Sequence, residues 1–349
     1  MLQKVAAFAS YRGTNYRLWP PTRGFLLLQV LPGPLTARRN GPIVVGMDAR
    51  TEFRDFLTSR RARITPEQAG LPANGGNRRV TGLRREEVAL LAGVSADYYI
   101  KLERGNARGV SDSVLEALSR ALHLDEAERA HLFDLANAAN ASTRKATRTT
   151  KPHVRPSIQR ILDSMSTTPA YVRNRRLDIL ATNRLGKALL EPILAAPRQP
   201  PNVARFMFLD PTATDYYVDW ERMAAGTVAI LRAEAGRDPH DKALIDLVGE
   251  LSTQSDLFRT RWANHNVLQH RTGVKLLHHP VVGELTLEYD ALELPADTGL
   301  TIMAYSAEPA TPARDALNLL ASWAATMDQN NISDSETHPT STPWPGTCA

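Results

Sequence analysis

The first regular pattern of apolar positions begins just after Met47 and has the spacing of a helix. Phe53, Phe56 and Leu57 fall at positions i, i+3 and i+4, which places them on one helical face. After a loop rich in Gly and Asn at residues 72–77, four further helical segments are separated by short polar turns. They are Arg85–Gly93, Ser95–Arg104, Ser111–Leu122 and Asp125–Asn137. The pattern therefore predicts a domain of five helices over residues 48–140.

Beyond residue 156 the pattern alternates between helical and period-two spacing. Short strands are expected at residues 170–174 and 177–182, and three longer runs alternate as half-buried strands do: 273–279, 284–292 and 300–307. The helices expected around them cover residues 157–165, 185–194, about 213–235, 240–252 and 256–265, and a last one runs from Thr311 to about Ala325. The predicted fold class is α+β and multidomain, with the second domain at residues 157–326.

In three segments the apolar residues follow neither helical nor strand spacing. Residues 141–156 are polar and basic and are predicted to form a linker, and residues 327–349, rich in Pro, Thr and Ser, a disordered tail. Residues 1–46 contain Pro-Pro and Pro-Gly-Pro and no acidic residue. Two interpretations of them stay open: a disordered basic arm that contacts DNA, or translated upstream sequence with Met47 as the true start. We favour the second, because the domain pattern begins immediately after Met47.

Charge is distributed unevenly along the chain. The net charge is +6 over residues 1–46, 0 over 47–140, +8 over 141–176 and −9 over 177–349. A polyanion is therefore attracted to the first half and repelled by the second. The single cysteine, Cys348, excludes a disulfide framework, and no stretch approaches the roughly 20 apolar residues that a membrane span needs. We expect a cytoplasmic protein without membrane association.

The segment from Arg85 to Gly105 has the spacing of a helix-turn-helix. Ala89 is a small residue where two short helices must cross closely, and Gly93 provides the positive φ that the turn requires. Ser95 then caps the second helix through its hydroxyl. The positions spaced to face the common core are Val88, Val94, Tyr99 and Leu102. A helix presented in this way fits the major groove of DNA, where its N-terminal residues meet base edges.

The predicted DNA-contacting residues lie on and around this second helix. The exposed side of the helix contains Ala96, Asp97, Tyr98, Ile100 and Lys101. The predicted contacts are Ser95 at the cap, Ala96, Asp97, Tyr98 and Lys101 on that side, Arg84, Arg85 and Arg104 at positions suited to phosphates, and Arg78 and Arg79 in the preceding loop. For Asp97 we favour a capping role over a contact with cytosine. For Tyr98 a DNA contact and simple packing stay equally open.

Two longer stretches carry a family resemblance. GLRREEVALLAGVSADYYIKLERG (residues 82–105) and SDSVLEALSRALHLDEAERAHLFDLA (residues 111–136) resemble the XRE, or lambda-repressor-like, helix-turn-helix group. More narrowly, they look like regulators with an MmyB-type C-terminal domain, and PAYVRNRRLDILATN (residues 169–183) and HRTGVKLLHHPVVGELTLEYDALELP (residues 270–295) look like that domain. The resemblance covers residues 48–326. It implies a PAS-like α/β sensor domain that holds a fatty-acid-like ligand.

Apolar residues of the second domain are numerous enough for a plain core or for a lined cavity, and both interpretations stay open. The candidate lining residues are Phe206, Phe208, Trp220, Leu231, Trp262, Leu276, Leu287, Ile302 and Tyr305. A bound carboxylate would need a cation or hydrogen-bond donors, because an unpaired buried charge is costly. The candidates for that role are Arg205, Arg261, Arg271 and His279.

No enzymatic motif is convincing, so we expect no catalytic residues, no metal site and no cofactor other than a bound fatty acid. His278 and His279 would point to opposite faces of a strand, and no HExxH spacing occurs. A self-cleaving repressor with a Ser–Lys dyad would use the Ala235-Gly236 bond. We interpret that glycine instead as a helix stop.

The sequence thus predicts a sequence-specific transcription regulator that binds double-stranded DNA as a homodimer on a two-fold operator. Two alternatives remain: a non-specific DNA-binding protein, and an antitoxin-like module whose C-terminal domain binds a partner protein.

Overall fold

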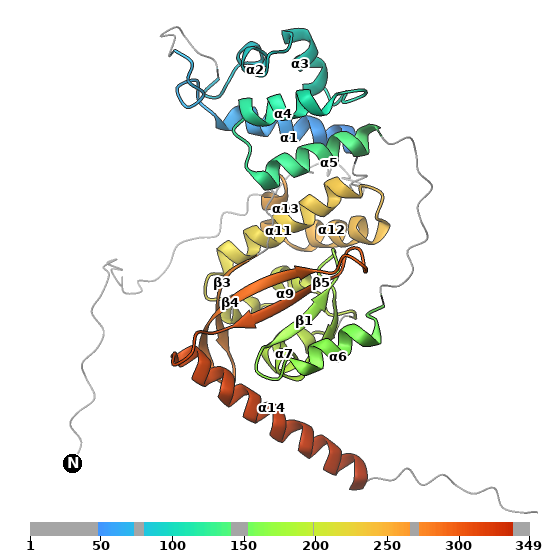
Figure 1. Ribbon diagram of the computed structural model, residues 1–349, viewed down its shortest axis with the longest axis vertical. Coiled ribbons are helices and arrows are strands. Elements are labelled where there is room, and N and C mark those ends of the chain that lie inside the picture. The colour runs from blue at the N-terminus through green and yellow to red at the C-terminus, as the bar shows by residue number, and fades with distance from the viewer. Residues whose placement is uncertain (1–47, 73–79, 141–152, 198, 266–271, 338–349) are drawn as a thin grey trace, which may run out of the picture. The chain divides into compact units, whose positions relative to one another are not determined.

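The computed structural model describes residues 48–72, 80–140, 153–197, 199–265 and 272–337, and side chains as far as Met327 (Figure 1). The predictions for residues 1–46, for Arg78 and Arg79 and for most of the linker lie outside these ranges. Among the described residues, no helix is long and apolar enough to cross a membrane.

The N-terminal part is helical, and its helices lie close to the predicted positions. They are α1 (Ala49–Arg63), α2 (Arg85–Ala92), α3 (Ala96–Glu103), α4 (Asp112–Ala121) and α5 (Glu126–Asn140). The core between them contains the predicted Phe53, Phe56 and Leu57 of α1, all fully buried. Val88 of α2 and Tyr99 and Leu102 of α3 are buried in the same cluster, as their spacing predicted.

The C-terminal part is built on an antiparallel sheet. Its strands are β1 (Ala170–Arg173), β2 (Ile179–Thr182), β3 (Thr272–His279), β4 (Gly283–Glu293) and β5 (Thr301–Ser306). They pair in the order β2-β1-β5-β4-β3, with Lys275 opposite Leu287 and Tyr289 opposite Tyr305. The first and last residues of each strand lie within two residues of the bounds that the sequence predicted.

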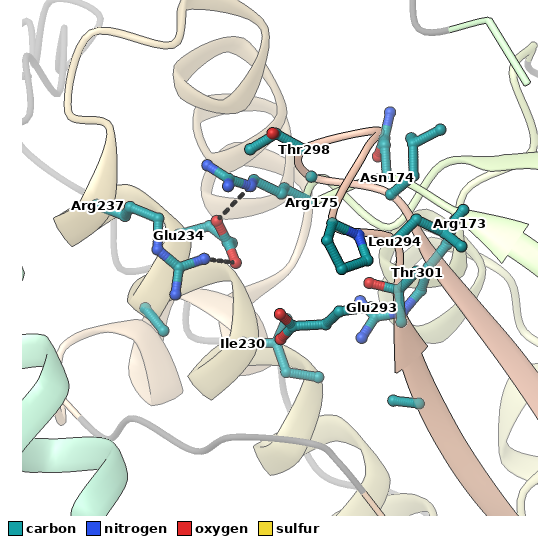
Figure 2. Close-up of a pocket in the computed structure, with 15 residues that line it drawn as sticks. Arg173, Asn174, Arg175, Ile230, Glu234, Arg237, Glu293, Leu294, Thr298 and Thr301 are labelled. Carbon is teal, nitrogen blue, oxygen red and sulfur yellow. Dashed lines mark hydrogen bonds and ion pairs between the residues drawn. The ribbon is translucent and has the colours of Figure 1, made fainter.

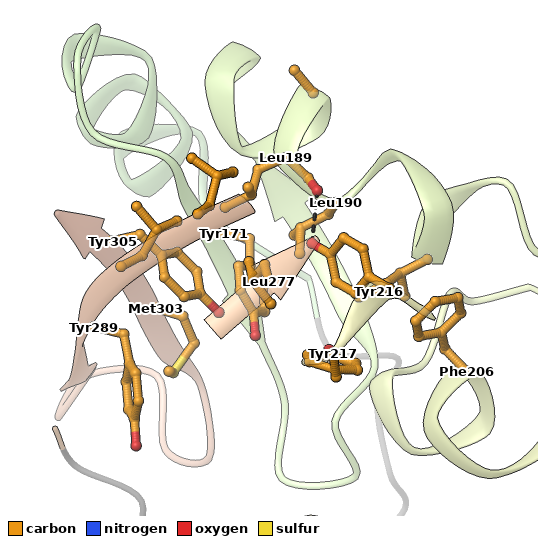
Figure 3. Packing of buried hydrophobic residues seen from close by; sticks show 14 of the residues in the cluster. Tyr171, Leu189, Leu190, Phe206, Tyr216, Tyr217, Leu277, Tyr289, Met303 and Tyr305 are labelled. Carbon is orange, nitrogen blue, oxygen red and sulfur yellow. Dashed lines mark hydrogen bonds between the residues drawn. The ribbon is translucent and has the colours of Figure 1, made fainter. Parts of the chain in front are cut away.

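The two faces of the sheet are covered by different helices. On one face, Val172 and Ile302 pack under α6 (Pro156–Ser164). On the other, Tyr171, Met303 and Tyr305 lie together in the larger core (Figure 3). The remaining helices are α7 (Arg184–Leu189), α8 (Glu191–Leu194), α9 (Val203–Leu209), α10 (Ala213–Tyr216), α11 (Trp220–Arg237), α12 (Lys242–Gln254), α13 (Asp256–Trp262) and α14 (Pro312–Thr337).

The structure differs from the predicted helices at several points. The helix expected at 213–235 is divided into α10 and α11, because Val218 N–H bonds to Leu276 of β3 and Asp219 then caps a new helix. The helix expected at 185–194 is likewise divided into α7 and α8, and α9 was not predicted. The last helix was expected to end near Ala325 but continues to Thr337, since residues 326–337 contain no Gly or Pro.

The interpretation of Gly236 as a helix stop is wrong. Gly236 lies inside α11, which ends one residue later and has Asp238 as its C-cap. Its role is close packing, because a Cβ atom at Gly236 would lie 2.3 Å from Cε1 of His131 on α5. The absence of a side chain, and not backbone freedom, is therefore what this position requires.

Candidate functional site

The turn between α2 and α3 has the geometry that the sequence predicted. Gly93 adopts φ 66° and ψ 31°, the left-handed conformation that glycine accepts without strain. The N–H of Val94 donates to the carbonyl oxygen of Ala89 at 3.0 Å, and Ala89 itself is buried where the helices meet. The Ser95 hydroxyl accepts from the N–H of Tyr98 at 3.2 Å, which caps α3.

Helix α3 presents one face to the core and another to solvent. Ser95, Asp97 and Lys101 are exposed, and so is Arg104 at the C-cap. The positions between them, Ala96, Tyr98 and Ile100, are half-buried. On the side predicted to be exposed, Asp97 and Lys101 are therefore open to solvent, whereas Ala96, Tyr98 and Ile100 are open only in part.

The C-terminal end of α3 is held in place by the buried carboxylate of Glu103, its last residue. Glu103 accepts from Nε of Arg61 at 2.6 Å and also binds the guanidinium of Arg85. Arg85, predicted as a phosphate contact, is thus held by Glu103 while its side chain stays about half exposed. Arg84 is exposed, and its N–H donates to Glu87 at 2.6 Å at the start of α2.

A basic cavity of about 390 Å³ lies beside the end of α3. Arg104 and Arg108 line it together with Arg50 from the first turn of α1, Gly105 and Asn106. Gly105 adopts φ +86°, and a Cβ atom there would lie 2.5 Å from the carbonyl oxygen of Arg50. The sequence pattern missed Arg50 and Arg108. The only signal was the pair of arginines on either side of Gly105, since nothing local indicated that α1 would approach them.

The predicted ligand-lining residues lie in different clusters of the C-terminal part. Phe206, Leu287 and Tyr305 are buried in the larger core, where Phe208 and Trp220 pack against it. Leu231 and Trp262 belong to a cluster formed with α12 and α13, and Ile302 lies on the opposite face of the sheet under α6. Leu276 is half-buried on β3.

An inner cavity of about 30 Å³ lies on the sheet face that carries Tyr171 and Met303. Its other lining residues are Arg173, Leu177, Val203, Met207, Tyr217, Met223, Thr227, Ile230 and Lys275. Lys275 is only 6% exposed, and its Nζ lies 2.7 Å from the Tyr305 hydroxyl and 5.0 Å from the ring centres of Tyr289 and Tyr305. Burial, and then the charge of Arg173, lower the pKa of Lys275 to about 7.

A larger, polar cavity of about 350 Å³ lies beside α11 (Figure 2), and we call it the α11 cavity. Arg173 borders both cavities. Glu234 of α11 accepts from Arg237 at 2.8 Å and lies 3.6 Å from Nε of Arg175. Burial raises the pKa of Glu234, although Arg237, Arg175 and Arg173 all oppose this shift.

The predicted partners of a bound carboxylate are engaged elsewhere. Arg205 is paired with Glu250 at 2.9 Å, and Arg261 binds Glu221 and lies 5.3 Å from the ring centre of Trp220. His279 is buried, with its Nε2 3.1 Å from the carbonyl oxygen of Ala188, while His278 is exposed. Arg271 lies outside the described residues. Arg173 and Lys275, the cations at the cavities, were missed because both lie in predicted strands, at 170–174 and 273–279, whose apolar pattern gave no sign that a charged side chain would be buried.

Helix α11 also contacts the N-terminal helices. Arg232, only 1% exposed, pairs with Glu52 of α1 and lies 4.0 Å from the ring centre of Trp262. His265 Nδ1 lies 3.0 Å from Arg232, and the carbonyl oxygen of His265 accepts from Arg60 of α1 at 2.6 Å. These charged side chains connect the N-terminal helices to the C-terminal part. The close packing of Gly236 of α11 against His131 of α5 adds a second contact between them.

Within the described residues, no three His, Cys, Asp or Glu side chains are grouped so that they could hold a metal ion.

A capped helix-turn-helix with an open second helix, next to an antiparallel-sheet domain that contains cavities, defines a DNA-binding regulator. Two family models agree with this class. Residues 52–132 match a helix-turn-helix domain, and residues 154–320 match the MmyB-like transcription regulator ligand binding domain. The chain is a helix-turn-helix, DNA-binding transcription regulator with an MmyB-like C-terminal domain. A comparison with curated proteins finds no match.

Proposed function

We propose that this regulator recognises a specific DNA sequence by placing α3 in the major groove. The observation that carries the proposal is the division of α3 into two faces. Tyr99 and Leu102 are buried, while Asp97 and Lys101 are open to solvent. Lys101 is then the side chain best suited to hydrogen-bond acceptors on base edges, and Asp97 supports the first turn of the helix.

Phosphates of the DNA backbone fit the basic residues at the edges of this face. Arg84 and Arg104 are exposed at the start of α2 and the end of α3. The basic cavity adds Arg50 and Arg108 beside Arg104, so three guanidinium groups can surround one phosphate position. Such contacts fix the register of α3 without selecting a sequence.

The finer identity of each domain is part of the proposal. Helices α1–α5 support a lambda-repressor-like domain of five helices. The strand order β2-β1-β5-β4-β3, with helices between β2 and β3, supports a PAS-like sensor domain. A single helix-turn-helix contacts few base pairs, which favours a homodimer on a two-fold operator.

A fatty-acid-like ligand is proposed for the inner cavity of the C-terminal domain. A volume of about 30 Å³ holds little more than a water molecule, so an acyl chain must displace side chains that line the cavity. Met207, Met223 and Met303 are among these, and methionine is the most adaptable apolar side chain. Lys275 becomes the partner of the carboxylate, whose arrival favours the protonated amine.

The ligand proposal is tested by native mass spectrometry of the purified protein. An adduct with the mass of a long-chain fatty acid is expected, and the substitution Lys275→Met should remove most of it. A wild-type protein that carries no amphiphile, even after incubation with palmitate, would contradict the proposal.

The DNA proposal is tested by titrating wild type, Lys101→Ala and Arg104→Ala at several salt concentrations. The DNA is a duplex selected by the full-length protein from a random library, compared with a random duplex. Arg104→Ala should weaken binding to both and reduce the salt slope by about one unit. Lys101→Ala should cost about 1–3 kcal/mol, mainly on the selected duplex. Lys187→Ala removes the same charge from an exposed position on α7 and should change binding to neither duplex.

Equal losses on both duplexes for Lys101→Ala would favour the non-specific DNA-binding alternative. No measurable binding to either duplex by the wild-type protein would favour the antitoxin-like, partner-binding alternative.

A further inference from the structure

The α11 cavity has the size and the walls of a small-molecule site. Its volume of about 350 Å³ lies in the range of ligand pockets. Three separate elements enclose it: Ile230, Glu234 and Arg237 of α11, the end of β1 from Arg173 to Arg175, and the turn between β4 and β5 (Figure 2). Walls drawn from three elements of the fold hold their polar groups in place before any ligand arrives.

Two polar groups at this cavity are not satisfied by the protein. Arg173 is only 9% exposed, and its guanidinium makes no hydrogen bond or ion pair with any residue that the structure describes. The Oε2 atom of Glu234 is buried and has no hydrogen-bond partner among the same residues. A buried cation without an ion-pair partner and a buried acceptor without a hydrogen bond are each costly, so an occupant that serves both would be stabilised, although Oε2 also lies 3.6 Å from Nε of Arg175.

The charges around the cavity define what that occupant carries. Arg175 and Arg237 are both directed at Glu234, as the dashed lines in Figure 2 show, and Arg237 also lies 3.6 Å from Asp134 of α5, so these two guanidinium groups face two carboxylates. Glu293 is exposed at the edge of the cavity. Arg173 remains as the guanidinium without an ion-pair contact among the described residues, so one negative charge on the ligand completes the site. Ile230, Ala291 and Leu294 provide an apolar side for the rest of the molecule.

We propose that the α11 cavity binds a small organic monoanion whose carboxylate pairs with Arg173 and whose hydrogen-bond donor serves Oε2 of Glu234. This site goes beyond the fatty-acid site proposed above, which lies in the inner cavity and relies on Lys275. It also adjoins the N-terminal helices, because Arg237, which binds Glu234, lies 3.6 Å from Asp134 of α5. An occupant that contacts Glu234 therefore acts on a side chain shared with the DNA-binding part.

The probe for this site is mandelate, which has a carboxylate, a neighbouring hydroxyl and an apolar ring. Binding to the full-length protein is measured by isothermal titration calorimetry, beside mandelamide, which lacks the charge, and phenylacetate, which lacks the hydroxyl. Mandelate should bind saturably and at least tenfold more tightly than mandelamide. Phenylacetate should bind more weakly than mandelate, because it leaves Oε2 of Glu234 without a donor.

Four variants, one of them a control on the surface, assign the binding to the cavity. Arg173→Gln should weaken mandelate at least tenfold, whereas Arg160→Gln, a matched change on exposed α6, should leave it unchanged. Glu234→Gln keeps the shape of the side chain and should reduce the preference for mandelate over phenylacetate, which keeps the test decisive if Arg173→Gln does not fold. Lys275→Met should not change mandelate binding, which separates this site from the inner cavity.

Absence of saturable binding by wild-type protein, or equal affinities in wild type and a folded Arg173→Gln variant, would overturn the proposal. The same preparations are titrated with the selected DNA duplex. DNA binding that persists while mandelate binding fails would discard the α11 cavity site alone and leave the regulator function intact.

Discussion

The core of the C-terminal part contains a residue of unusual chemistry, the buried lysine Lys275. In β3 the buried positions are Lys275, Leu277 and His279, while Val274 is exposed and Leu276 only half-buried. Hydrophobicity alone favours the opposite assignment, since it would place Val274 and Leu276 inside. The burial of this amine therefore costs stability, and the cost is largest while the amine is protonated.

The substitution Lys275→Met is therefore expected to stabilise the protein at neutral pH. Because the pKa of Lys275 is lowered to about 7, the unfolded chain binds a proton more readily than the folded one between pH 7 and about 10.5. Stability of the wild type should rise with pH across this window, with a slope of at most about 1.4 kcal/mol per unit from this residue. Below pH 7 the amine is protonated in the folded and the unfolded chain, so Lys275 adds no further slope and its destabilising effect is at its largest.

Urea denaturation at pH values from 7 to 10 checks this expectation. Lys275→Met should have a higher free energy of unfolding at pH 7 and a flatter dependence on pH, whereas Lys187→Met on the surface of α7 should behave as wild type. Identical slopes for wild type and Lys275→Met would show that the amine does not titrate in this window.

The junction of α1 and α3 is the critical contact at the scale of elements. Gly105 follows α3 at φ +86° and lies so close to Arg50 of α1 that a Cβ atom would overlap the Arg50 carbonyl oxygen. Gly109, a few residues on, has φ +71° and no neighbouring atom within 4 Å of a Cβ position. An alanine at Gly109 would therefore meet only backbone strain, whereas an alanine at Gly105 would meet both backbone strain and a steric clash.

Gly109→Ala is expected to cost about 1–2 kcal/mol of stability, the penalty for a left-handed alanine. Gly105→Ala should cost that amount and about 1–3 kcal/mol more, because the helices must move apart. Since Arg50 and Arg104 then separate, Gly105→Ala should also weaken DNA binding in the variant that remains folded. Thermal denaturation and a DNA titration measure the two effects, and equal stability losses for both glycines would contradict the close contact.

Elements with local signals could be predicted from the sequence, and elements set by distant contacts could not. The turn at Gly93 and the cap at Ser95 follow from the residues themselves, and so do the strands. The break between α10 and α11 depends on a hydrogen bond from Val218 to β3, more than fifty residues away. The same distinction holds for the sites: the exposed face of α3 follows from its period, but the approach of Arg50 to Arg104 requires the fold.

For the molecule as a whole, the contact between α11 and the N-terminal helices joins the DNA-binding part to the C-terminal part. One side of α11 borders the α11 cavity through Ile230 and Glu234, and Arg232 of the same helix is buried against α1. Glu52, the partner of Arg232, is itself largely buried. Burial raises the pKa of Glu52, but His265 and Arg232 outweigh it, so the pKa is lowered and the carboxylate stays charged.

Arg232→Met is expected to separate the unfolding of the two parts. The substitution leaves the buried carboxylate of Glu52 without its guanidinium partner and with Nδ1 of His265 3.6 Å away, and loss of one partner of a buried pair costs about 3–5 kcal/mol. Calorimetry should then show two transitions where the wild type shows one. The double variant Glu52→Leu with Arg232→Met removes both charges and should recover much of the coupling, because apolar side chains can replace a buried pair.

The pH dependence of the same contact gives an independent check. Because the pKa of Glu52 is lowered in the folded protein, its contribution is present above the ordinary pKa of 4.5 and is lost as the pH falls below it. Acidification of the wild type should therefore divide the single transition in two, as Arg232→Met does at neutral pH, while the double variant should lack this response. If Arg232→Met still unfolds in one transition at both pH values, the charged cluster does not hold the two parts together.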